Sequence, residues 1–109
     1  MELAVFARFH ARSGQAAAVE AAIREVIPPT RAEPACLSIE AFRSVRDPDL
    51  FLIHSRWTDE PAFDAHAALP HTVRFLETVQ PLIDHELDVS RTMKLIPSSA
   101  PPREGGDPS

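Results

Sequence analysis

Histidines are the residues of this sequence best suited to do chemistry, and three of the five are clustered near the middle of the chain. His66 follows Phe63 by three residues, so on a helix both side chains lie on one apolar face. His71 precedes Phe75 by four residues and would point toward the same place. An imidazole has an unperturbed pKa of about 6.5, which suits proton transfer at neutral pH. We therefore take His66 as the candidate catalytic base and expect His71 to line the same cavity.

Each of these side chains also has a purely structural interpretation. His66 could be a core histidine bonded to a backbone carbonyl, and His71 could simply begin a helix. His54 alternates with Ser55 along a strand, which predicts a place for His54 at the surface or in a dimer interface. Trp57 ends that strand, either as a core anchor or as a flat wall for an aromatic ligand.

Metal and covalent chemistry are not indicated by the residue spacing. His66 and His71 are five residues apart with Pro70 between them, unlike an i, i+4 ligand pair, and no cysteine or carboxylate pattern completes a set. Cys36 and Ser55 lack a local signature of an activated nucleophile. Only three glycines are present, two of them near the C-terminus, so no phosphate-binding loop is expected. The residue spacing therefore predicts no metal site and no phosphate- or dinucleotide-binding loop.

Hydrophobic periodicity predicts the elements that must position these residues. Period-two alternation is typical of strands, and apolar residues at i, i+3, i+4 and i+7 are typical of a helix. Arg46 to Asp49 has the turn chemistry of a hairpin. Thr58 or Asp59 can cap a helix that Pro70 breaks. The predicted elements are strand 2–10, a helix from Ser13-Gly14 to about Ile27, strand 37–42, strand 50–57, a helix from 58 or 59, a helix 72–83 and strand 87–95.

Two prolines set the expected end of the first helix. Pro28 and Pro29 cannot donate backbone hydrogen bonds, and each disfavours helical geometry in the residue before it. Pro81 should likewise kink or end the later helix. The resulting order predicts an α+β split βαβ arrangement, with a four-stranded antiparallel sheet and helices on one of its faces.

The second face of such a sheet would be uncovered in a chain of this size. Several strands are apolar on both sides, as at Val5 and Phe6, and at Ala41 and Phe42. A homodimer that packs sheet on sheet would bury this face. We therefore expect residues 1–96 to form one dimer-forming domain, followed by a disordered C-terminal tail at 97–109, where breakers replace the pattern.

Composition excludes several classes of function. The 109 residues include 11 Lys and Arg against 16 Asp and Glu, a net charge of -5, with no basic cluster for nucleic acid or an anionic membrane. No apolar run is long enough to cross a bilayer. The single Cys36 and an N-terminus without a signal-peptide pattern favour a soluble protein in the cytoplasm.

Four segments together resemble the antibiotic biosynthesis monooxygenase and quinol monooxygenase family. The likeness covers about residues 2–95, and it rests on the order and spacing of the segments rather than on any one of them. These segments are Glu33-Pro34-Ala35-Cys36-Leu37, Asp47-Pro48 before Leu50 to Trp57, Thr58-Asp59-Glu60-Pro61-Ala62-Phe63-Asp64-Ala65-His66, and Pro70-His71-Thr72-Val73-Arg74-Phe75.

The resemblance implies a ferredoxin-like subunit, a dimeric barrel and a pocket between sheet and helices. It also implies oxygenation of a quinol, anthrone or similar phenol with molecular oxygen, without flavin, haem or metal. His66 matches the family's helix histidine and Trp57 its strand-end aromatic. Ser55 stands where many members have Glu, and the chain has no tyrosine. The expected site contains His66 as the base, with the substrate contacted by Val5, Ser55, Trp57, Phe63, His71, Phe75 and Leu76.

Three other functions are weighed against oxygenation. The haem-degrading relatives' Asn, Trp and His positions appear here as Ala7, His66 and Leu76, which disfavours haem degradation but leaves haem binding by another histidine open. An isomerase acting on a small carbonyl compound would turn over without oxygen. A non-catalytic ligand-binding or stress-response dimer would have a pocket filled by its own side chains.

Overall fold

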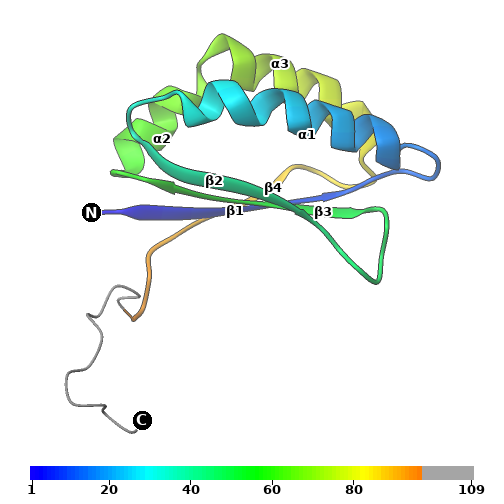
Figure 1. The fold of residues 1–109 in the computed structure, drawn as a ribbon, viewed down its shortest axis with the longest axis horizontal. Coiled ribbons are helices and arrows are strands. Elements are labelled where there is room, and N and C mark those ends of the chain that lie inside the picture. Colours follow the sequence, from blue (N-terminus) through cyan, green and yellow to red (C-terminus); the bar gives the residue numbers. More distant parts are fainter. Residues whose placement is uncertain (97–109) are drawn as a thin grey trace, which may run out of the picture.

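The computed structural model describes residues 1–96, and the proposed tail at 97–109 lies outside the described residues. Figure 1 shows a sheet with the helices layered over one face. The elements are β1 (Leu3–His10), α1 (Ala16–Arg31), β2 (Cys36–Arg43), β3 (Leu50–Trp57), α2 (Glu60–Ala67), α3 (Pro70–Val79), the 3-10 helix η1 (Gln80–Leu82) and β4 (Asp88–Thr92). This confirms the predicted α+β ferredoxin-like class.

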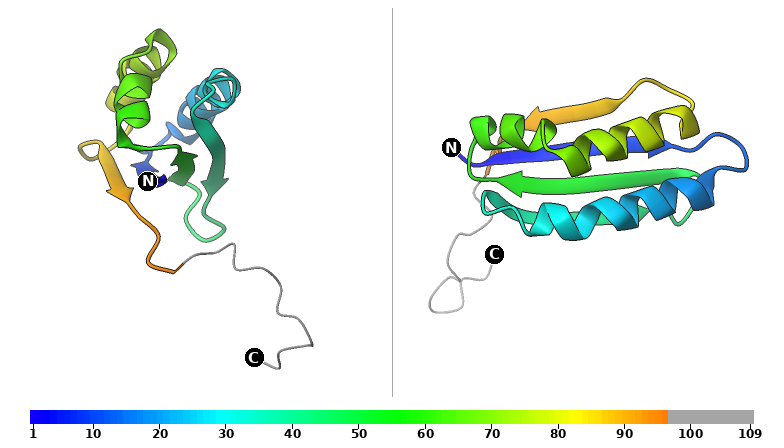
Figure 2. Two further views of the ribbon diagram at one scale, coloured as in Figure 1. Left: turned by 90° about the vertical axis from the view of Figure 1, so that its left-hand side faces the viewer. Right: turned by 90° about the horizontal axis from the view of Figure 1, so that it is seen from above.

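The strand order is β2-β3-β1-β4, and every neighbouring pair is antiparallel. The two views of Figure 2 show α1 lying over the β2 side of the sheet and α2 with α3 over the β1 and β4 side. The candidate residues on β1 and β3 therefore lie on the central strands, beneath the boundary between α1 and the α2–α3 pair.

The core forms between the sheet and the helices, as the strand alternation predicts. Val5 and Phe9 of β1 are buried, whereas Phe6 between them is exposed. On α1, the buried Val19, Ile23 and Val26 recur with helical spacing. The helix face and the strand face read from the sequence therefore meet in one hydrophobic layer.

The predicted end of the first helix is wrong, because α1 continues through Pro28 and Pro29 to Arg31. The prolines remove two backbone donors, but the last turn is bonded in other ways. The Thr30 hydroxyl donates to the Val26 carbonyl at 2.8 Å, and the Ala32 N–H donates to the Pro28 carbonyl at 3.2 Å. Tertiary packing of the buried Thr30 outweighs the local preference of the prolines.

Smaller boundary differences follow from capping and pairing. Of the two predicted caps, Thr58 and Asp59, it is Asp59 that caps α2, and its Oδ1 accepts the Ala62 N–H at 2.8 Å. Pro70 is the first residue of α3 instead of lying before it, and Pro81 falls in the 3-10 turn that follows α3. The last strand covers only Asp88–Thr92, the stretch that pairs with β1.

The face of the sheet opposite the helices is uncovered in the single chain. Phe6, Phe42 and Leu52 are 51%, 53% and 40% exposed there. The half-buried His54 lies on the same face, where its ring stacks on that of Phe6 with centroids 4.7 Å apart.

Within residues 1–96, no helix is both long and apolar enough for a membrane crossing.

Candidate active site

A cavity of about 270 Å³ lies between the sheet and the helices. Its walls are mostly apolar side chains from β1, β3, β4 and all three α-helices, with a few polar groups among them. Six of the residues singled out from the sequence line it, namely Val5, Ser55, Phe63, His66, Phe75 and Leu76. A small apolar cavity with few polar groups is typical of a small-molecule site.

His66 supplies the imidazole of this cavity from the last turn of α2, where it is the buried residue of its helix. Its ring lies 4.5 Å from the Trp57 ring and 5.5 Å from the Phe63 ring, measured between centroids. Burial lowers the pKa of His66 from its usual value, and the hydrogen bond with Glu33 opposes this shift only in part. The neutral ring is therefore favoured at neutral pH.

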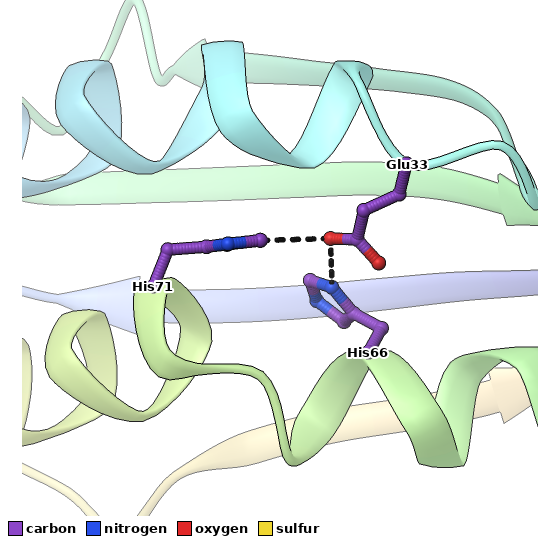
Figure 3. Close-up of side chains that lie close together, drawn as sticks. All are labelled: Glu33, His66 and His71. Carbon is purple, nitrogen blue, oxygen red and sulfur yellow. Dashed lines mark hydrogen bonds and ion pairs between the residues drawn. The ribbon is translucent and has the colours of Figure 1, made fainter.

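Glu33 orients this ring, although the sequence analysis does not assign it any role. Figure 3 shows one carboxylate oxygen of Glu33 facing both histidine rings. Glu33 Oε2 lies 2.7 Å from His66 Nδ1 and 2.8 Å from His71 Nε2. Because a carboxylate only accepts, each of these nitrogens carries a hydrogen. In the neutral His66 ring, Nε2 is then left as the acceptor.

His71 does not line the cavity, which corrects the expectation that both imidazoles share it. It contributes instead to a second pocket, of about 450 Å³, between α1 and α3. The two histidines are joined through one carboxylate rather than through a common space. The proline between them starts α3 in a new direction, so their sequence spacing does not give their geometry.

Trp57 is fully buried and also lies outside the cavity wall. Its indole Nε1 donates to the Ser55 hydroxyl at 2.9 Å, and its ring packs against His66 and Phe63. Trp57 therefore supports the residues that face the cavity. Because the Ser55 oxygen accepts this bond, the hydroxyl hydrogen of Ser55 remains available for donation to another group.

Arg91 of β4 also lines the cavity, and the sequence analysis does not single it out. Its guanidinium bonds Asp64 at 2.7 Å and Glu60 at 3.0 Å, and it lies over the Phe63 ring at 4.9 Å. These contacts tie the edge strand to α2 beside the cavity. The strand alternation that places Arg91 opposite Val5 is the signal that could have found it.

Within residues 1–96, two groups of His, Asp and Glu side chains are of the types and closeness that could hold a metal ion. Glu33, His66 and His71 form one, and His10, Asp47 and Asp49 form the other. In the first group, Glu33 supplies a carboxylate ligand that the sequence spacing does not reveal. The second is more exposed, and His10 Nδ1 is already bonded to Asp84 at 2.7 Å.

Comparison with known proteins gives one consistent result. The family model for antibiotic biosynthesis monooxygenase matches residues 3–78. The chain is 32% identical over 98 residues to the Mycobacterium tuberculosis protein named "Putative monooxygenase Rv0793", covering 90% of this chain and 96% of that protein.

Solved structures agree with the sequence match. The structure of Rv0793 superposes with a TM-score of 0.85 at 28% identity, covering 91% of this chain and all (100%) of the other. PA3566 from Pseudomonas aeruginosa superposes with a TM-score of 0.81 at 27% identity, covering 87% and 95% of the two chains. The family model covers well over half of the sequence, and the fold agrees along nearly its whole described length. The chain therefore belongs to the antibiotic biosynthesis monooxygenase family.

Proposed function

We propose that this protein is a cofactor-independent monooxygenase that oxidises a quinol, an anthrone or a similar phenolic small molecule with molecular oxygen. The observation that supports this most directly is His66, a buried imidazole in the wall of an apolar cavity with Glu33 holding its Nδ1. Membership of the antibiotic biosynthesis monooxygenase family supports this reaction class. The cavity volume suits a compact aromatic molecule.

The proposed reaction begins when His66 Nε2 accepts the phenolic proton of the substrate. Glu33 favours the tautomer that has this nitrogen free, and it stabilises the imidazolium that forms. The phenolate then passes one electron to oxygen, and the radical pair combines to form a carbon–oxygen bond. One oxygen atom stays in the product and the other leaves as water, so the substrate supplies all four electrons.

The cavity wall supports this chemistry in two ways. Its apolar side chains exclude water, which strengthens each remaining polar contact. The Ser55 hydroxyl, oriented by the Trp57 indole, can donate to the phenolate oxygen as negative charge develops. Trp57 and His71 act indirectly in this proposal, because neither lines the cavity.

Oxygen uptake by the purified full-length chain tests the proposal. A panel of hydroquinones and anthrones is expected to give substrate-dependent oxygen consumption with one water formed per product, and added EDTA should not lower the rate. Loss of activity in EDTA would overturn the cofactor-independent assignment. Turnover of a carbonyl compound without oxygen would favour an isomerase instead. Binding across the panel without turnover would favour a ligand-binding protein.

We propose that the protein is a cytoplasmic homodimer. In this dimer a second copy of the chain covers the open face of the sheet. Phe6, Phe42 and Leu52 form an exposed apolar patch on adjacent strands, and isolated soluble domains rarely expose such a patch. Packing two such faces would remove all three side chains from water.

Replacing Leu52 with Glu is expected to convert the dimer to a monomer, because a carboxylate would lose its hydration in the apolar interface. Sedimentation equilibrium at micromolar concentration measures the change directly. Val45→Glu is the matched control, since Val45 is fully exposed in the turn between β2 and β3 and away from this face. A monomeric wild type, or a dimeric Leu52→Glu variant, would contradict the proposed interface.

A further inference from the structure

We infer that Glu33, His66 and His71 form a binding site for one divalent transition-metal ion, with Zn²⁺ as the reference ligand. The observation behind this inference is the convergence of one carboxylate and two imidazoles on a single point (Figure 3). Their ligand atoms all lie within 4.8 Å of one another. The site stands independently of the proposed oxygenation.

The distances fit an ion with little rearrangement. Glu33 Oε2 is 2.7 Å from His66 Nδ1 and 2.8 Å from His71 Nε2. Ligands at about 2.1 Å from a tetrahedral ion lie about 3.4 Å apart. The two oxygen–nitrogen distances would therefore have to lengthen by about 0.6 to 0.7 Å for an ion to replace the two hydrogen bonds.

Three separate elements hold the ligands in place. Glu33 lies in the turn after α1, His66 in the last turn of α2, and His71 in the first turn of α3. Their side chains are only 13%, 10% and 18% exposed. Ligands ordered in this way lose little conformational entropy when an ion binds, and the low exposure limits competition from bulk water.

The chemistry of the donors selects the class of ion. Two imidazole nitrogens and one carboxylate oxygen suit Zn²⁺, Co²⁺ and Fe²⁺, whereas Mg²⁺ and Ca²⁺ prefer sites made of oxygen. Three protein ligands leave a further coordination position for water. The Thr72 hydroxyl, 3.3 Å from His66 Nδ1, is close enough to bond a ligand of the ion.

An ion at this site would also change the cavity, a consequence that does rest on the proposed function. Coordination by Nδ1 requires the proton of the neutral His66 ring to move to Nε2. The nitrogen available to a molecule in the cavity then changes from an acceptor to a donor. Zn²⁺ would therefore inhibit oxygen uptake, and EDTA would reverse this inhibition.

Calorimetric titration of the EDTA-treated full-length chain with ZnCl₂ tests the site without any substrate. We expect one ion per chain, with affinity at least about 10-fold weaker in His71→Asn and in Glu33→Gln. His10→Asn is the matched control, because it removes the histidine of the other metal-like cluster and should leave the affinity unchanged.

Co²⁺ substitution gives a second readout, since its visible absorption reports coordination by nitrogen ligands. The absorption band should be present in the wild type and in His10→Asn, and lost in His71→Asn, while thermal unfolding shows that each variant is folded. No heat of binding in the wild type, or equal affinity in folded His71→Asn, would overturn the site. A chain that binds Zn²⁺ but consumes no oxygen would overturn the proposed function alone.

Discussion

Replacing His66 with alanine is expected to lower kcat/KM for oxygen-dependent turnover by about 100-fold or more, the usual contribution of a positioned general base. The reason is the buried ring that lines the cavity and has its Nδ1 held by Glu33 at 2.7 Å. Alanine removes the only imidazole in the wall of this cavity among the described residues. Initial rates of oxygen uptake with the best substrate of the quinol and anthrone panel measure the loss.

Two companion variants separate a catalytic effect from a structural one. His54→Ala removes an imidazole from the open sheet face and should retain the wild-type rate per active site if the dimer persists. Glu33→Gln leaves His66 in place with a weaker partner, so its rate should fall less than that of His66→Ala. A folded His66→Ala variant with the wild-type rate would refute a base at this position.

Replacing Trp57 with alanine is expected to lower the free energy of unfolding by about 3–5 kcal/mol, the usual cost of deleting a large core aromatic. Trp57 is fully buried and packs against both His66 and Phe63. Its removal also leaves the buried Ser55 hydroxyl without its indole donor. In a domain of this size, the midpoint of thermal unfolding should fall by more than about 12 °C.

Trp57→Phe is the matched variant, because it keeps an aromatic ring and removes the indole N–H. Its expected cost is about 1–2 kcal/mol from the lost hydrogen bond and the smaller ring. Urea unfolding of the three proteins, compared at equal protein concentration, gives the two differences. Equal stability of the wild type and Trp57→Ala would mean that Trp57 is not a core anchor.

The fold could be predicted well because its signals are local. Strand alternation around Val5 and Phe9, the hairpin turn before β3 and the Asp59 cap each depend on neighbouring residues alone. The end of α1 could not be predicted in this way. Burial of Thr30 and its bond to the Val26 carbonyl are tertiary effects, and they outweigh the local effect of Pro28 and Pro29.

The site could be predicted only in part, since its residues meet through packing. Helical periodicity gave His66 its inward face, and strand alternation gave Val5 and Ser55 theirs. Glu33 lies 33 residues from His66 and 38 from His71, so spacing carried no sign of their contact. Its position in the Glu33-Pro34-Ala35 run, one of the segments that resemble the family, was the available signal.

The positions of His71 and Trp57 outside the cavity depend on side-chain direction. Trp57 shares the core side of β3 with Ser55, yet it lies at the strand end, where it packs beneath α2 and outside the cavity. His71 begins α3, and its ring contacts the same Glu33 oxygen as His66 from another direction. The direction of each side chain cannot be predicted from the helix or strand that contains it, because the turns between the elements set that direction.

Pro28 and Pro29 have a further effect through the unfolded chain. A proline ring restricts the conformations of an unfolded segment, so less conformational entropy is lost when that segment folds. In this chain the restriction falls within five residues of Glu33, in the last turns of α1. The two prolines therefore limit the conformations of the segment next to Glu33 even in the unfolded chain. This restriction favours a preorganised site around the Glu33 carboxylate.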